Sequence, residues 1–231
     1  MKIISVRKGF TADHSSTSYE FLAIDEPLNQ EEINEVSSLS SRTRPDDRAA
    51  SFFYKGDFNN LPGGWWPLIE KYYDIMYSES YDWWVFAVAF SESDPDKQKE
   101  IARYEFAGLE DLGVNINIVK DRIIVSFYCV LEYGHAYAVL DNNSSNGYKN
   151  NKKDLKDYLH EDPLLQLLAD IRKQLIEGDY RVFDIFWLEY GAPLYSEEEI
   201  KELELPYNNS EIDYESLPKN LQYISRLLRR I

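Results

Sequence analysis

Apolar and polar residues alternate with a period of two in several short stretches, which is the pattern of half-buried β-strands. Residues 114–118 show this alternation, and residues 51–54 form a shorter run. Residues 17–25 carry Tyr19, Phe21 and Ala23 on one face and Leu22 and Ile24 on the other, which predicts a strand buried on both faces. The segment WWVFAVAF, residues 83–90, is apolar throughout, which indicates a central strand covered on both faces. Three further strands are predicted: residues 123–131, joined to residues 114–118 by a tight Lys120-Asp121 turn, residues 135–141 and residues 180–190.

Apolar residues recur every three or four positions in other stretches, which predicts helices. Asn29 and Glu32 form a capping box for a helix that ends near Ser41, and Pro67 begins a second helix with an apolar stripe from Leu68 to Met76. Three more helices are predicted: from the Asp94-Pro95 cap to about Gly108, from Asp162-Pro163 to Gly178, and along a C-terminal stripe from Leu217 to Ile231.

The order of these elements predicts the fold class. Strands and helices alternate as far as residue 90, and a meander of strands then precedes the last helices. We therefore expect residues 1–231 to form a single α+β domain with a mixed, largely antiparallel sheet flanked by helices. The polar run 142–153 is expected to be an exposed loop, and residues 196–216, with eight acidic residues and one lysine, a charged excursion that includes a short helix.

Charge narrows the classes of partner. The chain has 41 acidic and 25 basic residues among 231, a net charge of −16, so most of its surface repels a phosphate backbone. This predicts that nucleic acid is not a partner. The acidity fits a basic protein partner or imitation of nucleic acid, although a solvated acidic face is the simpler interpretation. The hydrophobic content of 44% is enough to fill a core.

Cysteine usage and hydropathy predict the compartment. The single cysteine, Cys129, cannot form an internal disulfide and is expected to be a buried, inert thiol. The apolar run at the N-terminus is too short for a signal peptide, and no run approaches the roughly 20 apolar residues of a membrane span. We expect a cytoplasmic protein that does not bind a membrane.

The segment ADHSS places Asp13, His14 and Ser15 side by side. Successive side chains of an extended chain point to opposite sides, so these three residues cannot form the hydrogen-bonded relay of a nucleophilic triad. His14 could still act as a base with a distant acid. The alternative is that the polar groups bind backbone donors where the chain enters its first strand. The candidate catalytic residues are His14, Asp13, Asp57, Glu79 and Asp82.

Metal and cofactor motifs are missing from the sequence. His135 and His160 are isolated, and a single thiol lacks the paired spacing of a zinc site. The Gly63-Gly64 pair fits a turn rather than a phosphate loop. The sequence therefore predicts no metal and no cofactor.

Residues 63–84 contain four of the five tryptophans. Their flat rings could line a groove for a peptide, a sugar or a base, because rings give stacking area at a low cost in entropy. The candidate binding residues are Trp65, Trp66, Trp83 and Tyr81. The alternative, which we favour, is that a helix and a strand bury these rings against each other, since their spacing fits core packing.

Three stretches are distinctive: GFTADHSSTSYEFLAID, LSSR at residues 39–42, and LPGGWWPLIEKYYDIMYSESYDWWVFAVAF. Together they resemble a family of uncharacterised prokaryotic proteins, in which an ADHSST segment leads into a strand and a tyrosine-rich helix precedes a tryptophan-containing strand. The resemblance covers about the first 130 residues. It implies that the N-terminal stretch and the aromatic helix–strand unit form one framework, and it implies no activity, because none is established for the family.

These observations predict a non-enzymatic accessory or protein-interaction protein. The partner is expected to be a protein that contacts the aromatic surface or the acidic segment 196–216. Two alternatives stay open. One is a hydrolase or metal-dependent enzyme that uses His14 with nearby carboxylates, and the other is an acidic mimic of nucleic acid that blocks a basic protein.

Overall fold

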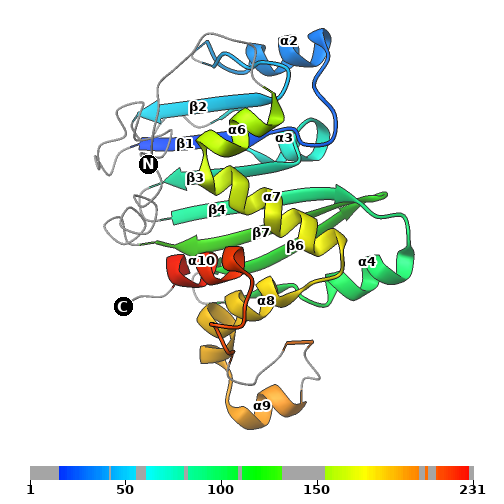
Figure 1. Cartoon of the computed structure of the whole chain (residues 1–231), viewed down its shortest axis with the longest axis vertical. Coiled ribbons are helices and arrows are strands. Elements are labelled where there is room, and N and C mark those ends of the chain that lie inside the picture. Colours follow the sequence, from blue (N-terminus) through cyan, green and yellow to red (C-terminus); the bar gives the residue numbers. More distant parts are fainter. Residues whose placement is uncertain are drawn as a thin grey trace.

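A seven-stranded antiparallel sheet with helices on both faces forms the centre of the molecule (Figure 1). The computed structural model describes residues 16–41, 43–55, 61–80, 83–108, 111–131, 154–202, 206–207 and 212–228. The strand order is β2-β1-β3-β4-β7-β6-β5. The strands are β1 (Ser16–Leu22), β2 (Ala49–Lys55), β3 (Ile75–Ser80), β4 (Trp83–Ser91), β5 (Phe106–Ala107), β6 (Gly113–Val119) and β7 (Arg122–Val130).

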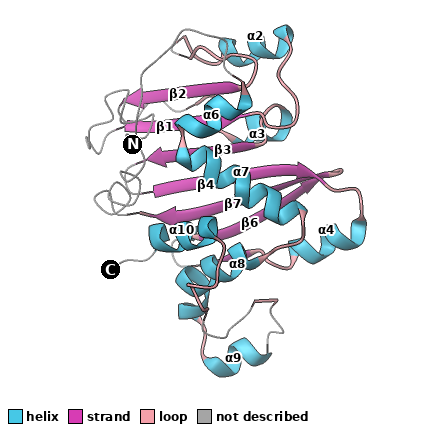
Figure 2. Cartoon of the chain, in the orientation of Figure 1, coloured by secondary structure: helices cyan, strands magenta, loops and turns pink. Residues whose placement is uncertain are grey.

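Helices cover both faces of this sheet, and Figure 2 shows α7 crossing one of them, whereas α9 lies beyond the end of the sheet. They are α2 (Gln30–Ser38), α3 (Trp66–Lys71), α4 (Pro95–Ala102), α6 (Leu155–Glu161), α7 (Pro163–Ile176), α8 (Arg181–Phe186), α9 (Glu197–Glu202) and α10 (Lys219–Leu228). A π-helical turn, Trp187–Gly191, and a 3₁₀ turn, Ala192–Leu194, follow α8 directly. The predicted α+β class is confirmed, and every strand pair among the described residues is antiparallel.

Alternation along the strands creates two cores. In β4, Phe86 and Val88 point to the face covered by α7, whereas Ala87 and Ala89 point to the opposite face. The larger core lies between the sheet and α7, α8 and α10, and the smaller core lies between the sheet and α2 and α3. Central strands are therefore apolar on both faces, as the run at residues 83–90 predicted.

Residues 180–190, predicted as a strand, form α8 and the π-helical turn. Val182, Phe183, Ile185 and Phe186 are all buried, and their spacing also fits one face of a helix. Eight of the eleven positions in this segment are apolar, and the charged residues Arg181, Asp184 and Glu189 are spaced as on one side of a helix, a period that the strand prediction overlooked. The aromatic and β-branched content misled the prediction.

The helix predicted from Pro67 to Met76 is shorter than expected, because α3 ends at Lys71 and Met76 lies in β3. The backbone N–H of Asp74 donates to the carbonyl of Leu22 at 3.0 Å, which pulls the chain into the sheet before another helical turn can form. The helix predicted to continue to about Gly108 likewise ends at Ala102 and is followed by β5.

The other predicted elements have different outcomes. The strands at residues 51–54 and 114–118 and the helix framed by Asp162 and Gly178 are confirmed. The strand predicted at residues 17–25 is present but ends at Leu22, and the C-terminal helix is present over Lys219–Leu228. The predictions for residues 135–141 and 142–153 lie outside the described residues. Helix α6 was not predicted, although Asp154 and Asp157 form a capping box at its start.

A cluster of charged residues joins both faces at one end of the sheet. Asp74 Oδ2 accepts hydrogen bonds from the backbone N–H groups of Ile24 at 2.7 Å and Asp25 at 2.9 Å, and its Oδ1 accepts one from Arg122 Nη2 at 3.2 Å. Arg172 of α7 donates to Asp25, and its Nη2 lies 4.0 Å from Asp74 Oδ1. Four segments distant in sequence thus meet at Asp74.

Side chains form hydrogen bonds with backbone N–H and carbonyl groups along the outer edges of the sheet. At β2, the Thr43 hydroxyl donates to the carbonyl of Ser51 at 2.9 Å, and Asp46 Oδ1 accepts from the N–H of Ala49 at 2.7 Å. The short β5 pairs only with Gly113 and Val114 of β6, and beyond this pairing a carboxylate oxygen of Glu105 accepts from the N–H of Ile116 at 2.8 Å. Such side chains make the edge of a sheet less accessible to another strand.

Candidate functional site

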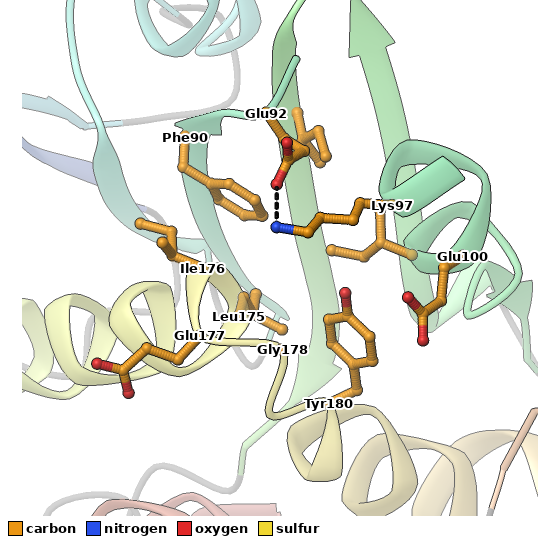
Figure 3. A pocket seen from close by; sticks show the side chains of 11 residues that line it. Phe90, Glu92, Lys97, Glu100, Leu175, Ile176, Glu177, Gly178 and Tyr180 are labelled. Carbon is orange, nitrogen blue, oxygen red and sulfur yellow. Dashed lines mark ion pairs between the residues drawn. The ribbon is translucent and has the colours of Figure 1, made fainter. Parts of the chain in front are cut away.

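A pocket of about 210 Å³ opens where the end of β4, helix α4 and the end of α7 meet (Figure 3). Elements from three separate parts of the chain form its walls. The lining residues are Phe90, Glu92, Lys97, Glu100, Ile101, Ile123, Leu175, Ile176, Glu177, Gly178 and Tyr180.

The floor of the pocket is apolar. Phe90, Ile101, Ile123 and Leu175 are all buried and belong to the larger core. Ile176, the last residue of α7, is 47% exposed and extends this apolar surface to the rim. The four floor residues are no more than 3% exposed, so Ile176 is the apolar lining residue with substantial surface for an incoming aliphatic group.

Glu92 is the most firmly held of the charged groups. Its backbone N–H donates to the carbonyl of Asp121 at 2.7 Å, and its Oε1 accepts from the backbone N–H of Asp94 at 2.9 Å. Gln98 Nε2 donates to the Glu92 carbonyl at 2.6 Å. The hydrogen bond from Asp94, together with Lys97, lowers the pKa of Glu92 below its ordinary value, so this carboxylate stays charged at neutral pH.

Lys97 provides the positive charge of the pocket. Its Nζ lies 3.3 Å from Glu92 Oε2, and its side chain is 57% exposed whereas that of Glu92 is 20% exposed. Figure 3 shows Lys97 reaching toward Glu92, with the hydroxyl end of Tyr180 directed to the same space. Burial, and then the charge of Glu100, raise the pKa of Tyr180, so its hydroxyl stays protonated and can donate a hydrogen bond at neutral pH.

The end of α7 closes one side of the pocket. Gly178 has φ 82°, a conformation that favours glycine, and its N–H donates to the carbonyl of Leu175 at 3.1 Å. Glu177 caps the helix, and in Figure 3 its carboxylate points away from the centre of the pocket. The partial negative charge of a helix C-terminus adds to that of the carboxylates.

These features favour a cationic ligand with an aliphatic body. Glu92 and Glu100 line the pocket together with Lys97, and the floor beneath them is apolar. Glu177 also lines it, but its carboxylate points away from the centre and lies 3.8 Å from Lys173 Nζ. A lysine or arginine side chain has both properties, because its methylene groups can cover apolar surface while its charged end meets a carboxylate.

Most of the candidate catalytic residues lie outside the described residues: His14, Asp13, Asp57 and Asp82. Glu79 is described and is buried in β3, away from the pocket, opposite Ser18 of β1 and Trp84 of β4. Its charge, with those of Asp162 and Glu20, acts on the buried hydroxyl of Tyr77, which donates to Asp162 Oδ2 at 2.9 Å. The structure thus places Glu79 in a buried polar cluster under α7.

The candidate aromatic residues lie in two places. Trp65 and Trp66 contact each other edge to face, with ring centroids 5.5 Å apart, and pack against the smaller core as half-buried side chains. Trp83 begins β4 and is 43% exposed. Among the described ring contacts, none joins Trp83 to this pair. Tyr81 lies outside the described residues.

Tyr207 is the buried aromatic residue of the acidic segment 196–216, and Ile200, Ile212 and Tyr214 of this segment also pack against the larger core. The ring of Tyr207 stacks on Trp187 with centroids 4.4 Å apart, and its hydroxyl donates to the carbonyl of Tyr104 at 2.6 Å. Burial and nearby acids raise the pKa of Tyr207. Helix α9, predicted as a short helix, precedes Tyr207 in the chain.

Sequence reasoning did not find the pocket, although it found two of its boundaries. The Asp94-Pro95 cap and Gly178 were recognised as the ends of helices. Pockets often form where helix ends approach a sheet, so these caps were the available signal. The pattern of residues along the chain did not show that these two helix ends lie close together in the fold.

Within the described residues, no three histidine, cysteine, aspartate or glutamate side chains are grouped in a way that could hold a metal ion. None of the described helices is long and apolar enough to cross a bilayer. In comparisons with known proteins, no family model, curated protein or solved structure matches the chain.

Proposed function

We propose that this protein is a non-enzymatic interaction protein that captures a basic segment of a partner protein in the pocket between β4, α4 and α7. The observation that carries the proposal is the combination of an apolar floor with Glu92, Glu100 and Lys97 in a single pocket. The net charge of −16 favours approach of a basic partner.

The pocket supports this function better than the acidic segment or the exposed tryptophan does. In the pocket, Glu92 is held by neighbouring backbone groups, so a partner meets a carboxylate that is already in position. Trp83 also offers exposed apolar surface, but no described contact places a charged group next to it. Point substitutions are the appropriate test, because deletion of residues 196–231 would remove α10, whose Leu221, Ile224 and Leu228 are buried in the larger core.

The first test uses an acetylated pentapeptide with a central lysine between leucines, titrated into the protein and followed by calorimetry and by ¹⁵N and methyl NMR. We expect a dissociation constant of about 1 mM or tighter at low salt, weakening as salt screens the charges. The signals of Gly178, Ile123 and Leu175 should shift, whereas that of Ile69 in the smaller core should not.

Matched substitutions identify the carboxylate. Glu92→Gln should weaken binding about tenfold or more, because a charge-assisted contact is lost, whereas Glu31→Gln on α2 should change it less than about twofold. Equal effects of the two substitutions, or shifts confined to residues outside the pocket, would contradict the proposal. Spermidine shifting the same signals as strongly as the peptide would point to a free polyamine instead. Displacement of this protein from a basic partner protein by duplex DNA would favour nucleic-acid mimicry.

A further inference from the structure

The ammonium group of Lys97 lies at the position that a captured cation would need. Its Nζ is 3.3 Å from Glu92 Oε2, and its side chain extends from α4 over the apolar floor (Figure 3). The chain therefore already places a lysine side chain of its own in a pocket whose other charged residues are glutamates.

The two members of this ion pair are held very differently. Glu92 is fixed through its N–H, its carbonyl and Oε1 by three hydrogen bonds. Lys97 is more than half exposed, and the one contact described for its Nζ is that with Glu92 Oε2. An exposed ion pair contributes little to stability, so the lysine can leave while the carboxylate stays in place.

The available oxygen also indicates the chemistry of the incoming group. Glu92 Oε1 is engaged by the backbone N–H of Asp94, and Oε2 faces Lys97. Arginine pairs best with a carboxylate through two parallel hydrogen bonds, which require both oxygens, whereas an ammonium group is a compact point charge that needs one.

We propose that Lys97 is an internal occupant of the pocket, and that a lysine side chain of the partner protein replaces it on Glu92. This inference rests on the proposed function of the pocket. Lys97 competes with the partner for Glu92. The association constant measured for the protein is therefore that of the vacated pocket multiplied by the fraction of molecules in which Lys97 has left Glu92.

The experiment compares Lys97→Met with Lys99→Met, using the same lysine pentapeptide and versions with central arginine or acetyl-lysine. Both substitutions remove one positive charge from the same helix. Lys99 is exposed and does not line the pocket, so its substitution controls for the change in net charge. We expect Lys97→Met to tighten binding of the lysine peptide about three- to tenfold and Lys99→Met to change it less than about twofold. The arginine peptide should bind more weakly than the lysine peptide, and the acetyl-lysine peptide should not bind.

Each other outcome has a defined meaning. If the lysine peptide binds the unaltered protein but Lys97→Met leaves its affinity unchanged or weaker, the competition is refuted and the proposed function stands. Equal tightening by both substitutions would reduce the effect to net charge and would also refute the competition. Tighter binding of the arginine peptide would overturn the preference for lysine. Failure of all peptides to bind any variant would overturn the proposed function itself.

Discussion

The side chain of Asp74 binds groups that belong to both sides of the sheet. Its two oxygens accept hydrogen bonds from two backbone N–H groups and from Arg122, and Arg172 approaches from the other face. A buried carboxylate stabilises the fold only while all of its hydrogen-bond donors are present. If one group is removed, a buried polar group is left unpaired, and the free energy of unfolding falls.

We therefore expect Asp74→Asn to lower the free energy of unfolding by about 2–4 kcal/mol, since the amide keeps the size of the side chain but removes its charge and one acceptor. Urea denaturation measures the change. Asp96→Asn is the control, because Asp96 is 92% exposed and is paired only with Lys99 at 3.6 Å in the described contacts. Its effect should stay within about 0.5 kcal/mol, and a similar loss in both variants would remove the special role of Asp74.

The π-helical turn after α8 requires a glycine at its last position, because there is no room there for a side chain. Gly191 ends the turn with φ −96°, a conformation open to any residue, so its backbone does not require glycine. A Cβ at this position would lie 2.2 Å from Cε3 of Trp187. The glycine is therefore required by the close approach of the indole ring, which also stacks on Tyr207.

Gly191→Ala should displace the Trp187 ring and lower the free energy of unfolding by about 2 kcal/mol or more, as overpacking in a core does. Near-UV circular dichroism and urea denaturation detect the two effects. Gly64→Ala separates a collision from backbone strain, because a Cβ there meets open space while φ is 73°. That control should destabilise by about 1 kcal/mol without altering the near-UV spectrum. An unchanged spectrum for Gly191→Ala would contradict this account.

The elements also show what could be predicted from sequence. Residues 114–118 alternate strictly and Asp162-Pro163 caps a helix, so local chemistry alone determined both predictions. Residues 180–190 were assigned to a strand because of their aromatic and β-branched content, although the spacing of their charged residues fits a helix. Met76 was assigned to a helix, but the hydrogen bond from the Asp74 N–H to the Leu22 carbonyl brings the chain into the sheet before it. The pocket was beyond prediction because it joins Glu92, Lys97 and Gly178 through tertiary contacts.

At the scale of the whole molecule, two cores share one sheet. Leu168 is buried in the larger core and Ile69 in the smaller one, and β3 and β4 contribute side chains to both. Arg172 adds a direct connection, because its Nε donates to the carbonyl of Ala89 at 2.7 Å while its guanidinium also binds Asp25. We infer that the cores unfold together as one domain.

Leu168→Ala and Ile69→Ala should each lower the stability by about 2–5 kcal/mol and should move the same single transition. Far-UV circular dichroism and tryptophan fluorescence, recorded on one sample, report whether the transitions coincide. Ile118→Ala, at an exposed position of β6, should have a small effect. A separate early transition in one variant, seen by one probe alone, would show that the two cores are independent domains.

The side chains along the flanks of the sheet have a consequence for crowded or heated solutions. Thr43, Asp46 and Glu105 already engage backbone groups that a strand from another molecule would need in order to dock and extend the sheet. Templated polymerisation at these flanks would first have to dislodge a hydroxyl and two carboxylates, and the carboxylates also repel a second copy of so acidic a chain.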